Sequence, residues 1–513
     1  MLLQETVLCA TAPTKSQPGP GLIALHDIQT GATLASFKQT NAGPRSLAVL
    51  ESKNTHGGLL FASQPDKSIL NVYNFQKDQI SLKIVLPEKL TCVALDHRGD
   101  FFAGGTAAGR IYLWETASGI LYNAWDAHYR QVDVLRFSND GAALVSGSDD
   151  SGVSVWSVSR LLDEDTQNEH VVPYCTLSDH TLPVSDILCG AGLFPECRIL
   201  TSSVDHSVKL WDISSRSLLT TFQFPQPISH LAWDVTERFF FAASAEGSIH
   251  QMNLFREREN KLGGTVTEAI GGAGVTDIIR IDDEDSRQAR KKRLITVGQP
   301  ISSMCISLTS SMLLVGTEEG LIHLYDIPSH QLLRTISSHK GMSIAHLETM
   351  IKPPDLIGHI SLDFRVGTSD TTKDMVPVKP VMPFQRMRDM KARDAHEICT
   401  VLPSHNQPYY DEALSYSSDE LLRDHAFFVQ PAAAAAAGVA NPIELNTKVV
   451  ELEAEIEKLR EQLGQAKSLN DDMWEKMVKK VVLGKEKEKE SSSPEGSQDT
   501  DESERRRKRG RGA

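Results

Sequence analysis

The first two thirds of the chain repeat one pattern of alternating apolar and polar positions. Each copy begins at a small or turn residue and ends near an anchor residue, usually aromatic and often followed by Asp. The copies are GLIALHDI from Gly21, SILNVYNF from Ser68, GRIYLWET from Gly109, SGVSVWSV from Ser151, SVKLWDIS from Ser207, SIHQMNLF from Ser248 and GLIHLYDI from Gly320. Alternation with a period of two predicts half-buried strands.

The spacing of the copies indicates how the strands are grouped. The anchors are His26, Tyr73, Trp114, Trp156, Trp211, Met252 and Tyr325, at intervals of 47, 41, 42, 55, 41 and 73 residues by subtraction. Three intervals match the roughly 40–45 residues of a four-stranded propeller blade. Flanking apolar segments supply the other strands, so residues 1–350 are predicted to form a closed, all-β, seven-bladed propeller without exposed sheet edges. The long intervals predict surface loops at 161–173 and 256–294, and we expect the second to be structureless.

The fullest unit resembles the WD40 family. It contains Asp179-His180, then Ser203, Asp205 and Ser207, and finally Trp211-Asp212. The resemblance implies that buried hydrogen bonds join His180, a hydroxyl residue, Asp205 and Trp211, and these residues with Ser203 are our candidates for locking the blade. His128, Asp150 and Trp156 repeat the arrangement one blade earlier, and His339 holds the same place before a last strand. A buried Asp or His needs a partner, because unpaired burial is costly.

The pattern changes after about residue 351. Residues 351–440 contain several prolines and predict an extended strap and linker, in which the segment from Pro383 is either a short helix or a docking element. Residues 441–483 carry a heptad repeat with Ile456, Leu463 and Asn470 at a positions and Leu452 and Leu459 at d positions. This pattern favours a parallel two-stranded coiled coil, so we expect a homodimer. The alternative is an amphipathic helix that docks on a partner or on the propeller.

Charge changes the picture mainly at the C-terminus. The chain has 53 Lys and Arg against 67 Asp and Glu, a net charge of −14, so as a whole it does not match nucleic acid. Residues 484–513 are poor in apolar residues and predict a disordered tail. The tail contains the basic run Arg505, Arg506, Arg507, Lys508 and Arg509. Such a run is typical of a nuclear import signal or a nucleic-acid contact, and a solvated charge cluster is the alternative.

Candidate chemistry is sparse. The 7 cysteines are scattered without a C-x-x-C pair, which predicts buried thiols rather than disulfides or a zinc site. The first residues do not resemble a signal peptide, and no apolar run approaches the roughly 18 residues that span a bilayer. Phosphate-binding, zinc-protease and serine-hydrolase motifs are missing from the sequence. We therefore expect a binding protein without cofactor or metal, not an enzyme.

Within the WD40 proteins, the chain resembles the WD-repeat subunits of the nuclear complex that matures the large ribosomal subunit precursor. The resemblance rests on ETVLCATA, FFAGGTAAGRIYLWETASG, QVDVLRFSNDGAALVSGSDDSGVSVW and FQRMRDMKARDAHEI, and on a C-terminal helix. It implies a nuclear and nucleolar scaffold with two non-propeller partners. It further implies association with the pre-large-subunit particle and an AAA-type remodelling ATPase, support for removal of internal transcribed spacer 2, and a link to replication licensing.

The main alternative is a substrate receptor of a cullin-type ubiquitin ligase. Such receptors commonly carry Trp-Asp-x-Arg after the anchor strand. Here Trp211-Asp212 is followed by Ile213 and Ser214, without the Arg. Neither the propeller face that meets each partner nor direct contact with RNA follows from the sequence.

Overall fold

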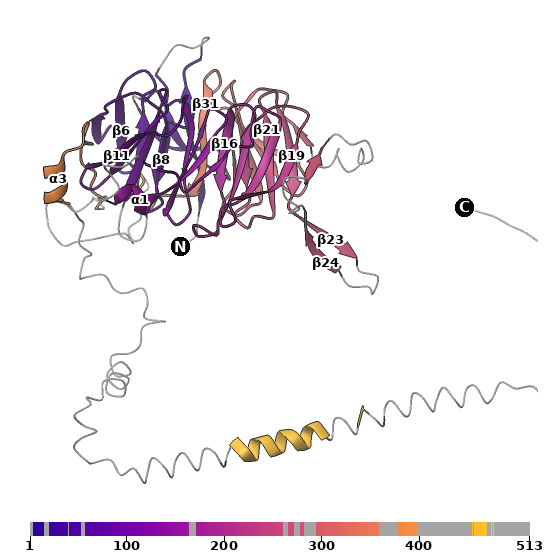
Figure 1. The fold of residues 1–513 in the computed structure, drawn as a ribbon. Coiled ribbons are helices and arrows are strands. Elements are labelled where there is room, and N and C mark those ends of the chain that lie inside the picture. Colours follow the sequence, from indigo (N-terminus) through magenta and orange to yellow (C-terminus); the bar gives the residue numbers. More distant parts are fainter. Residues whose placement is uncertain are drawn as a thin grey trace, which may run out of the picture. The chain divides into compact units, whose positions relative to one another are not determined.

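The computed structural model describes residues 4–14, 20–38, 40–52, 57–163, 171–259, 265–270, 277–281, 294–358, 377–398, 400, 454, 456–468, 473, 474 and 476. The chain divides into two units, residues 1–407 and 408–513, and each is considered by itself. The first unit is the predicted seven-bladed propeller, a ring of antiparallel sheets (Figure 1).

Six blades are formed by strands in chain order. Blade two comprises β4 (Leu47–Leu50), β5 (Leu59–Ser63), β6 (Ile69–Asn74) and β7 (Leu82–Val85). Blade three comprises β8 (Leu90–Leu95), β9 (Phe101–Thr106), β10 (Arg110–Glu115) and β11 (Leu121–Asp126). Blade four comprises β12 (Val132–Phe137), β13 (Ala143–Ser148), β14 (Val153–Ser157) and β15 (Cys175–Leu177). Blade five comprises β16 (Val184–Cys189), β17 (Arg198–Ser203), β18 (Ser207–Asp212) and β19 (Ser217–Gln223). Blade six comprises β20 (Ile228–Trp233), β21 (Phe239–Ser244), β22 (Ser248–Asn253) and β26 (Leu294–Thr296). Blade seven comprises β27 (Ile301–Ile306), β28 (Met312–Thr317), β29 (Ile322–Asp326) and β30 (Leu332–Ile336).

Blade one closes the ring with strands from both ends of the propeller. It contains β1 (Glu5–Ala12), β2 (Ile23–Asp27), β3 (Thr33–Phe37) and β31 (Ser343–Ile351). β1 pairs antiparallel with β31, with Cys9 opposite Leu347. The first strands of successive blades lie against one another around the centre, and β31 completes this inner set beside β27. The central strands of the blades are largely buried, because each sheet packs against two neighbours.

The insertion at residues 256–294 departs from the expectation of a structureless loop. Phe255–Glu259 (β23) and Thr265–Ala269 (β24) form a hairpin that projects from the ring (Figure 1). Ile278–Arg280 (β25) pairs in parallel with β19, so blade five has five strands rather than the four predicted. Residues 282–293 lie outside the described residues. The shorter insertion begins with helix α1 (Val158–Leu162) between β14 and β15.

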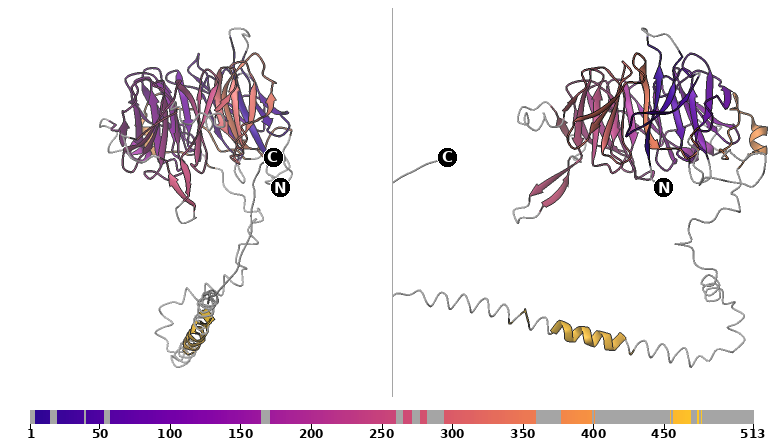
Figure 2. Two further views of the ribbon diagram at one scale, coloured as in Figure 1. Left: turned by 90° about the vertical axis from the view of Figure 1, so that its right-hand side faces the viewer. Right: turned by 180° about the vertical axis from the view of Figure 1, so that it is seen from behind.

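The described parts of the predicted strap pack on the propeller. After β31, Leu356 is fully buried, and the N–H of Ile357 donates to the carbonyl of Phe75. Residues 377–398 run along the outside of the ring and include helix α3 (Met390–Ala395), which the right-hand view of Figure 2 shows at the edge of the propeller. In the second unit, residues 456–468 are helical. No helix among the described residues is both long and apolar enough to cross a membrane.

Candidate interaction surface

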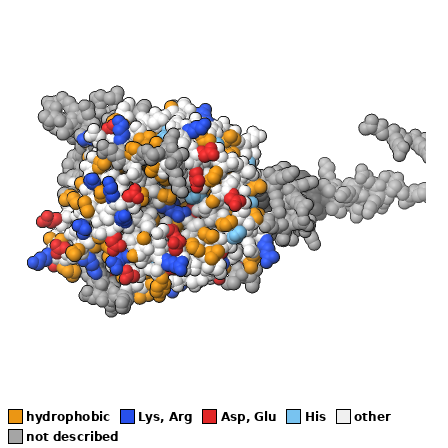
Figure 3. All heavy atoms as spheres, turned by 90° about the horizontal axis from the view of Figure 1, so that it is seen from above, with side chains coloured by type: hydrophobic (Ala, Val, Ile, Leu, Met, Phe, Trp, Pro, Cys, Tyr) orange, Lys and Arg blue, Asp and Glu red, His pale blue; other side chains and the backbone are white. Residues whose placement is uncertain are grey.

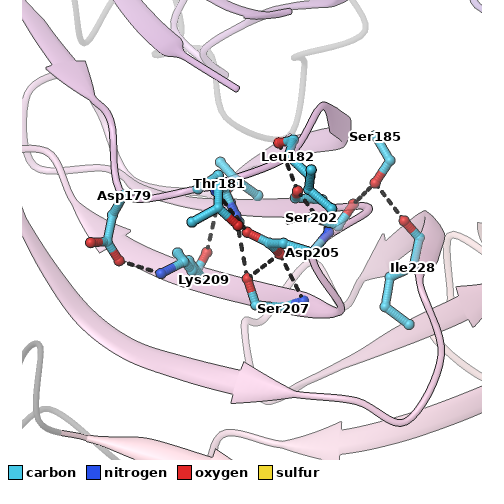
Figure 4. Close-up of polar contacts among 12 residues, drawn as sticks. Asp179, Thr181, Leu182, Ser185, Ser202, Asp205, Ser207, Lys209 and Ile228 are labelled. Atoms are coloured by element: carbon cyan, nitrogen blue, oxygen red, sulfur yellow. Dashed lines mark hydrogen bonds and ion pairs between the residues drawn. The ribbon is translucent and has the colours of Figure 1, made fainter. Parts of the chain in front are cut away.

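A polar network in blade five joins β17 and β18 to the loop before β16 (Figure 4). His180 Nδ1 lies 3.0 Å from Asp205 Oδ2, and His180 Nε2 lies 2.8 Å from the hydroxyl of Thr201. The indole N–H of Trp211 donates to the same hydroxyl at 2.9 Å. The network therefore links the loop, both central strands and the turn between them.

The carboxylate of Asp205 is fixed by four donors. It lies beside His180, accepts hydrogen bonds from the backbone N–H and the hydroxyl of Ser207 at 3.0 and 2.6 Å, and accepts the N–H of Thr181 at 3.1 Å. Burial raises the pKa of Asp205, but the hydrogen bonds from His180 and Ser207 outweigh burial and hold that pKa well below its usual range. The carboxylate is thus charged and oriented at neutral pH.

Ser203 does not take the place that the sequence suggested. Its hydroxyl donates to the carbonyl of Leu182 at 2.9 Å and accepts the N–H of Asp205 at 3.1 Å, so it shapes the turn. The hydroxyl between His180 and Trp211 belongs to Thr201. Thr201 lies two residues before Ser203 in β17 and is therefore further from the turn. Ser203 ends that strand and is too close to the turn to reach the indole.

Blade four repeats the network. His128 Nδ1 lies 3.1 Å from Asp150 Oδ2, and His128 Nε2 lies 2.8 Å from the hydroxyl of Ser146, which accepts the indole N–H of Trp156 at 2.9 Å. Burial lowers the pKa of His128, against the opposing effect of Asp150. Sequence reasoning missed both Ser146 and Thr201, although each is a hydroxyl residue ten positions before its Trp.

Blade three uses its anchor differently. Ten residues before Trp114 stands Gly104, which has no hydroxyl to offer. The indole N–H of Trp114 donates instead to the carbonyl of Gln385 on the strap, at 2.9 Å. The neighbouring Phe384 is buried and stacks on Trp114, with ring centroids 5.3 Å apart and planes 14° apart. The anchor of this blade thereby binds a segment from outside the blade.

Further contacts hold the strap along blade three. The backbone N–H groups of Met382 and Gln385 donate to the carbonyls of Thr116 and Gly119. In α3, the guanidinium of Arg393 donates to the carbonyl of Leu162 at 2.8 Å and lies 4.7 Å from the ring centre of Tyr122. The docked strap leaves Met387 and Met390 79% and 61% exposed.

The centre of the ring contains a cavity of about 660 Å³, to which the inner strands of several blades contribute. Arg45, just before β4, reaches across to β16 of blade five, where it donates to the carbonyl of Ser185 and lies 3.9 Å from Asp186. Burial and the charge of Arg45 lower the pKa of His230 to about 4. Arg45 therefore serves as a polar cross-link within the channel.

The loops that carry the blade networks also expose apolar side chains. Tyr129, next to His128, is 98% exposed, and Leu182 and Val204 beside the blade-five network are 46% and 41% exposed. We call these three residues the loop patch. Acidic and basic side chains are interspersed over the face seen in Figure 3, which shows no extended field of one sign. The loop patch consists of exposed apolar side chains, so it is better suited to protein contacts than to a polyanion.

Three side chains proposed for self-association lie in the described helical segment. Ile456, Leu459 and Leu463 are 51%, 58% and 72% exposed. Their spacing places them on one face of the helix. Leu452 and Asn470, the other members of that set, lie outside the described residues, as do Arg505, Arg506, Arg507, Lys508 and Arg509 of the proposed import signal.

Comparisons with known proteins agree with this architecture. Residues 119–157 and 172–212 match the WD40 family (WD domain, G-beta repeat). The chain is 33% identical to pre-rRNA-processing protein IPI3 of Mycosarcoma maydis, over 92% of this chain and 96% of the relative. It is 29% identical to pre-rRNA-processing protein crb3/ipi3 of Schizosaccharomyces pombe, over 68% of this chain and 78% of that relative. It is 31% identical to human WD repeat-containing protein 18, over 66% of this chain and 71% of that relative.

Proposed function

The chain belongs to the family of WD-repeat proteins that includes pre-rRNA-processing protein IPI3 and WD repeat-containing protein 18, and from this premise we propose that it acts in pre-rRNA processing as a scaffold. The observation that carries the proposal is the similarity to the Mycosarcoma maydis protein, which extends over 92% of this chain and 96% of that relative. A likeness of this extent includes the region beyond the blades. It is therefore more specific than the WD repeats alone.

A scaffold role fits the chemistry of the propeller. His128 and His180 hydrogen-bond within their blades, and Arg45 cross-links the channel, so these groups serve the fold. What remains available is surface: the loop patch, the projecting hairpin β23–β24 and the exposed side of the strap. Separate surfaces on one rigid ring suit a subunit that holds several partners at once.

In detail, the protein acts in the nucleus on the precursor of the large ribosomal subunit. It supports processing of internal transcribed spacer 2 as one of three subunits, beside two partners without propellers. The assembled complex meets an AAA-type remodelling ATPase on the pre-ribosome, and a link to replication licensing follows the same family resemblance. The run from Arg505 to Arg509 supplies the import signal.

The experiment is depletion of the tagged protein from its own cells, with gradient sedimentation and RNA analysis. We expect the tag to sediment with pre-large-subunit particles, and depletion to cause accumulation of precursors that retain internal transcribed spacer 2. Loss of large subunits without such precursors would restrict the role to assembly. Absence from these particles, with a cullin adaptor co-purifying instead, would contradict the proposal.

We also propose that the C-terminal helix makes the protein a dimer, because Ile456, Leu459 and Leu463 expose an apolar face that heptad pairing would bury. Replacing Leu452 and Leu459 together with Asp places charge in this seam and should halve the mass measured by light scattering. The matched control is Lys458→Asp, which adds an acid to the same helix outside the seam and should leave the mass unchanged. An unaltered mass in the double variant would mean that the helix does not mediate self-association, which leaves docking on a partner or on the propeller.

A further inference from the structure

Blade one contains a different set of side chains at the positions of the blade networks. His339, before β31, holds the place of His180. Cys9 in β1 corresponds to Thr201, and His26 in β2 corresponds to Trp211. The bridging hydroxyl is thus replaced by a thiol, and the indole is replaced by an imidazole. An indole N–H can only donate a hydrogen bond, whereas thiolates and imidazoles are ligands of transition metals.

The three side chains converge on one point. Cys9 Sγ lies 3.3 Å from His339 Nε2, and His26 Nε2 lies 2.7 Å from the same nitrogen. All three candidate ligand atoms lie within 4.8 Å of one another, and all three residues are buried. The two rings meet edge to face, with centroids 4.9 Å apart and planes 72° apart. The ring nitrogens therefore point towards each other and do not stack.

The second ring nitrogen of His26 has a partner of its own. Nδ1 lies 3.3 Å from the hydroxyl of Thr33. Metal-bound histidines commonly have their second nitrogen held by a hydrogen bond in this way. Nε2 is the nitrogen that faces His339 and is therefore the ligand atom that His26 offers.

We propose that Cys9, His26 and His339 bind one Zn²⁺ ion. In a tetrahedral site with Zn–N of about 2.05 Å and Zn–S of about 2.3 Å, two nitrogens lie about 3.3 Å apart and nitrogen and sulfur about 3.5 Å apart. The distance between Cys9 Sγ and His339 Nε2 already agrees, and the two ring nitrogens need to separate by roughly half an ångström. Cys9 Sγ and His26 Nε2, which lie within 4.8 Å of each other, need to settle at about 3.5 Å. His339, at 7% exposure, is the most accessible of the three, so its side of the site is where a water would complete the coordination.

The binding step is balanced without any co-reactant. Burial raises the pKa of Cys9 to about 12 and lowers that of His26 to about 4, so the metal-free site holds a neutral thiol and neutral imidazoles. Zn²⁺ then displaces one proton from the thiol, which is released to solvent, and the two imidazoles bind through lone pairs. The product is a thiolate site of charge +1 with one bound water.

The position of the site gives the metal a structural consequence. His339 is separated from His26 by 313 residues and from Cys9 by 330. These residues lie in the blade where the first and last strands of the propeller meet. A metal bound only by the closed ring stabilises the closed ring. Zn²⁺ would therefore stabilise the pairing of the first and last strands that closes the ring.

The test uses the full-length wild-type protein, purified without added chelator. Elemental analysis should find about one zinc per chain, and removal of the zinc should lower the thermal midpoint. One equivalent of Co²⁺ added to the apoprotein should produce a thiolate-to-cobalt charge-transfer band. X-ray absorption of the zinc form should show one sulfur and two imidazole nitrogens. A folded wild-type protein without zinc and without this band overturns the proposal.

Matched cysteine variants assign the ligands. Cys9→Ser should fold, because blade four has Ser146 at the same position, but it should lose the charge-transfer band and bind Zn²⁺ at least tenfold more weakly. Cys92→Ser is the control, since Cys92 is equally buried and contacts the carbonyl of Val132. It should keep both properties. Retention of the band in Cys9→Ser would place the metal elsewhere and overturn the assignment. If Cys9→Ser does not fold, the wild-type absorption spectrum decides.

Discussion

Blades five and three contain the same anchor residue in two settings. In blade five, Trp211 donates to Thr201 of its own blade, and the network continues through His180 to Asp205. In blade three, Trp114 donates to Gln385, 271 residues away on the strap. Blade three lacks the rest of the network as well, because Leu86, Gly104 and Ala108 stand at the positions of His180, Thr201 and Asp205. Without an acceptor in its own blade, the indole of Trp114 binds the strap instead.

The comparison shows how one blade of the propeller can come to bind a segment from outside that blade. Each blade must satisfy the buried indole N–H, because a buried donor without an acceptor costs about 1–3 kcal/mol. A blade without its hydroxyl can meet that need with a segment from outside. Blade three does so with Gln385 and fills the adjoining apolar space with Phe384. The strap is thus held by the hydrogen bond from the indole of Trp114 as well as by the burial of Phe384.

The largest effect is expected at Asp205 in blade five. Asp205→Ala removes the partner of a buried His and the acceptor of three further donors, so we expect a loss of about 3–4 kcal/mol in the free energy of unfolding. Denaturant unfolding measures this loss. Asp66→Ala, an exposed acid in the turn between β5 and β6, serves as the control and should be nearly neutral. A loss below about 1 kcal/mol for Asp205→Ala would mean that the network does not stabilise the blade.

The same carboxylate predicts a pH dependence. The pKa of Asp205 is lowered in the folded state, so its contribution is fully present above the unfolded pKa of about 3.9 and declines as the pH falls towards the folded pKa. Asp205→Asn removes this titration. The stability of the wild type should therefore fall more steeply than that of Asp205→Asn between about pH 5 and pH 3. Equal slopes in the two proteins would contradict the lowered pKa.

A smaller and more local effect is expected in the strap. Phe384→Ala empties the space between Trp114 and Phe102, with an expected cost of about 3 kcal/mol. Because the strap can leave while the blades remain closed, that cost should appear as strap release and only weakly as global unfolding. Trypsin should then cleave sooner near Arg386 and Arg388. Met387→Ala, at a highly exposed strap position, should leave cleavage unchanged.

The sequence predicts the ring well and its attachments poorly. The alternating anchors and their spacing indicated seven blades, because each blade is built from neighbouring residues with a period of two. The hairpin β23–β24 was missed because FRERE alternates between charges of opposite sign, not between apolar and polar residues. Strand β25 was missed because pairing with β19 depends on the sheet edge left open by blade five.

The residues of the candidate sites likewise divide into those that the sequence located and those that it did not. His128, Asp150, His180 and Asp205 were located through the resemblance to the WD40 family, because blades four and five both have the His and the Asp of that family at matching positions. Thr201 required the spacing of ten residues to Trp211 to be recognised. The convergence of Cys9 with His339 could not be predicted, because it depends on the pairing of β1 with β31 across the closed ring.

The smallest expected effects distinguish the two anchors directly. Trp114→Phe and Trp211→Phe each keep an aromatic ring and delete one indole N–H, so each should cost about 1 kcal/mol. Trp211→Phe should lower global stability and leave strap cleavage unchanged, since its acceptor Thr201 lies in its own blade. Trp114→Phe should accelerate tryptic cleavage of the strap with little change in global unfolding, since its acceptor is Gln385. If both variants act only on global stability, the strap is held by Phe384 alone, and the hydroxyl missing from blade three has no part in docking.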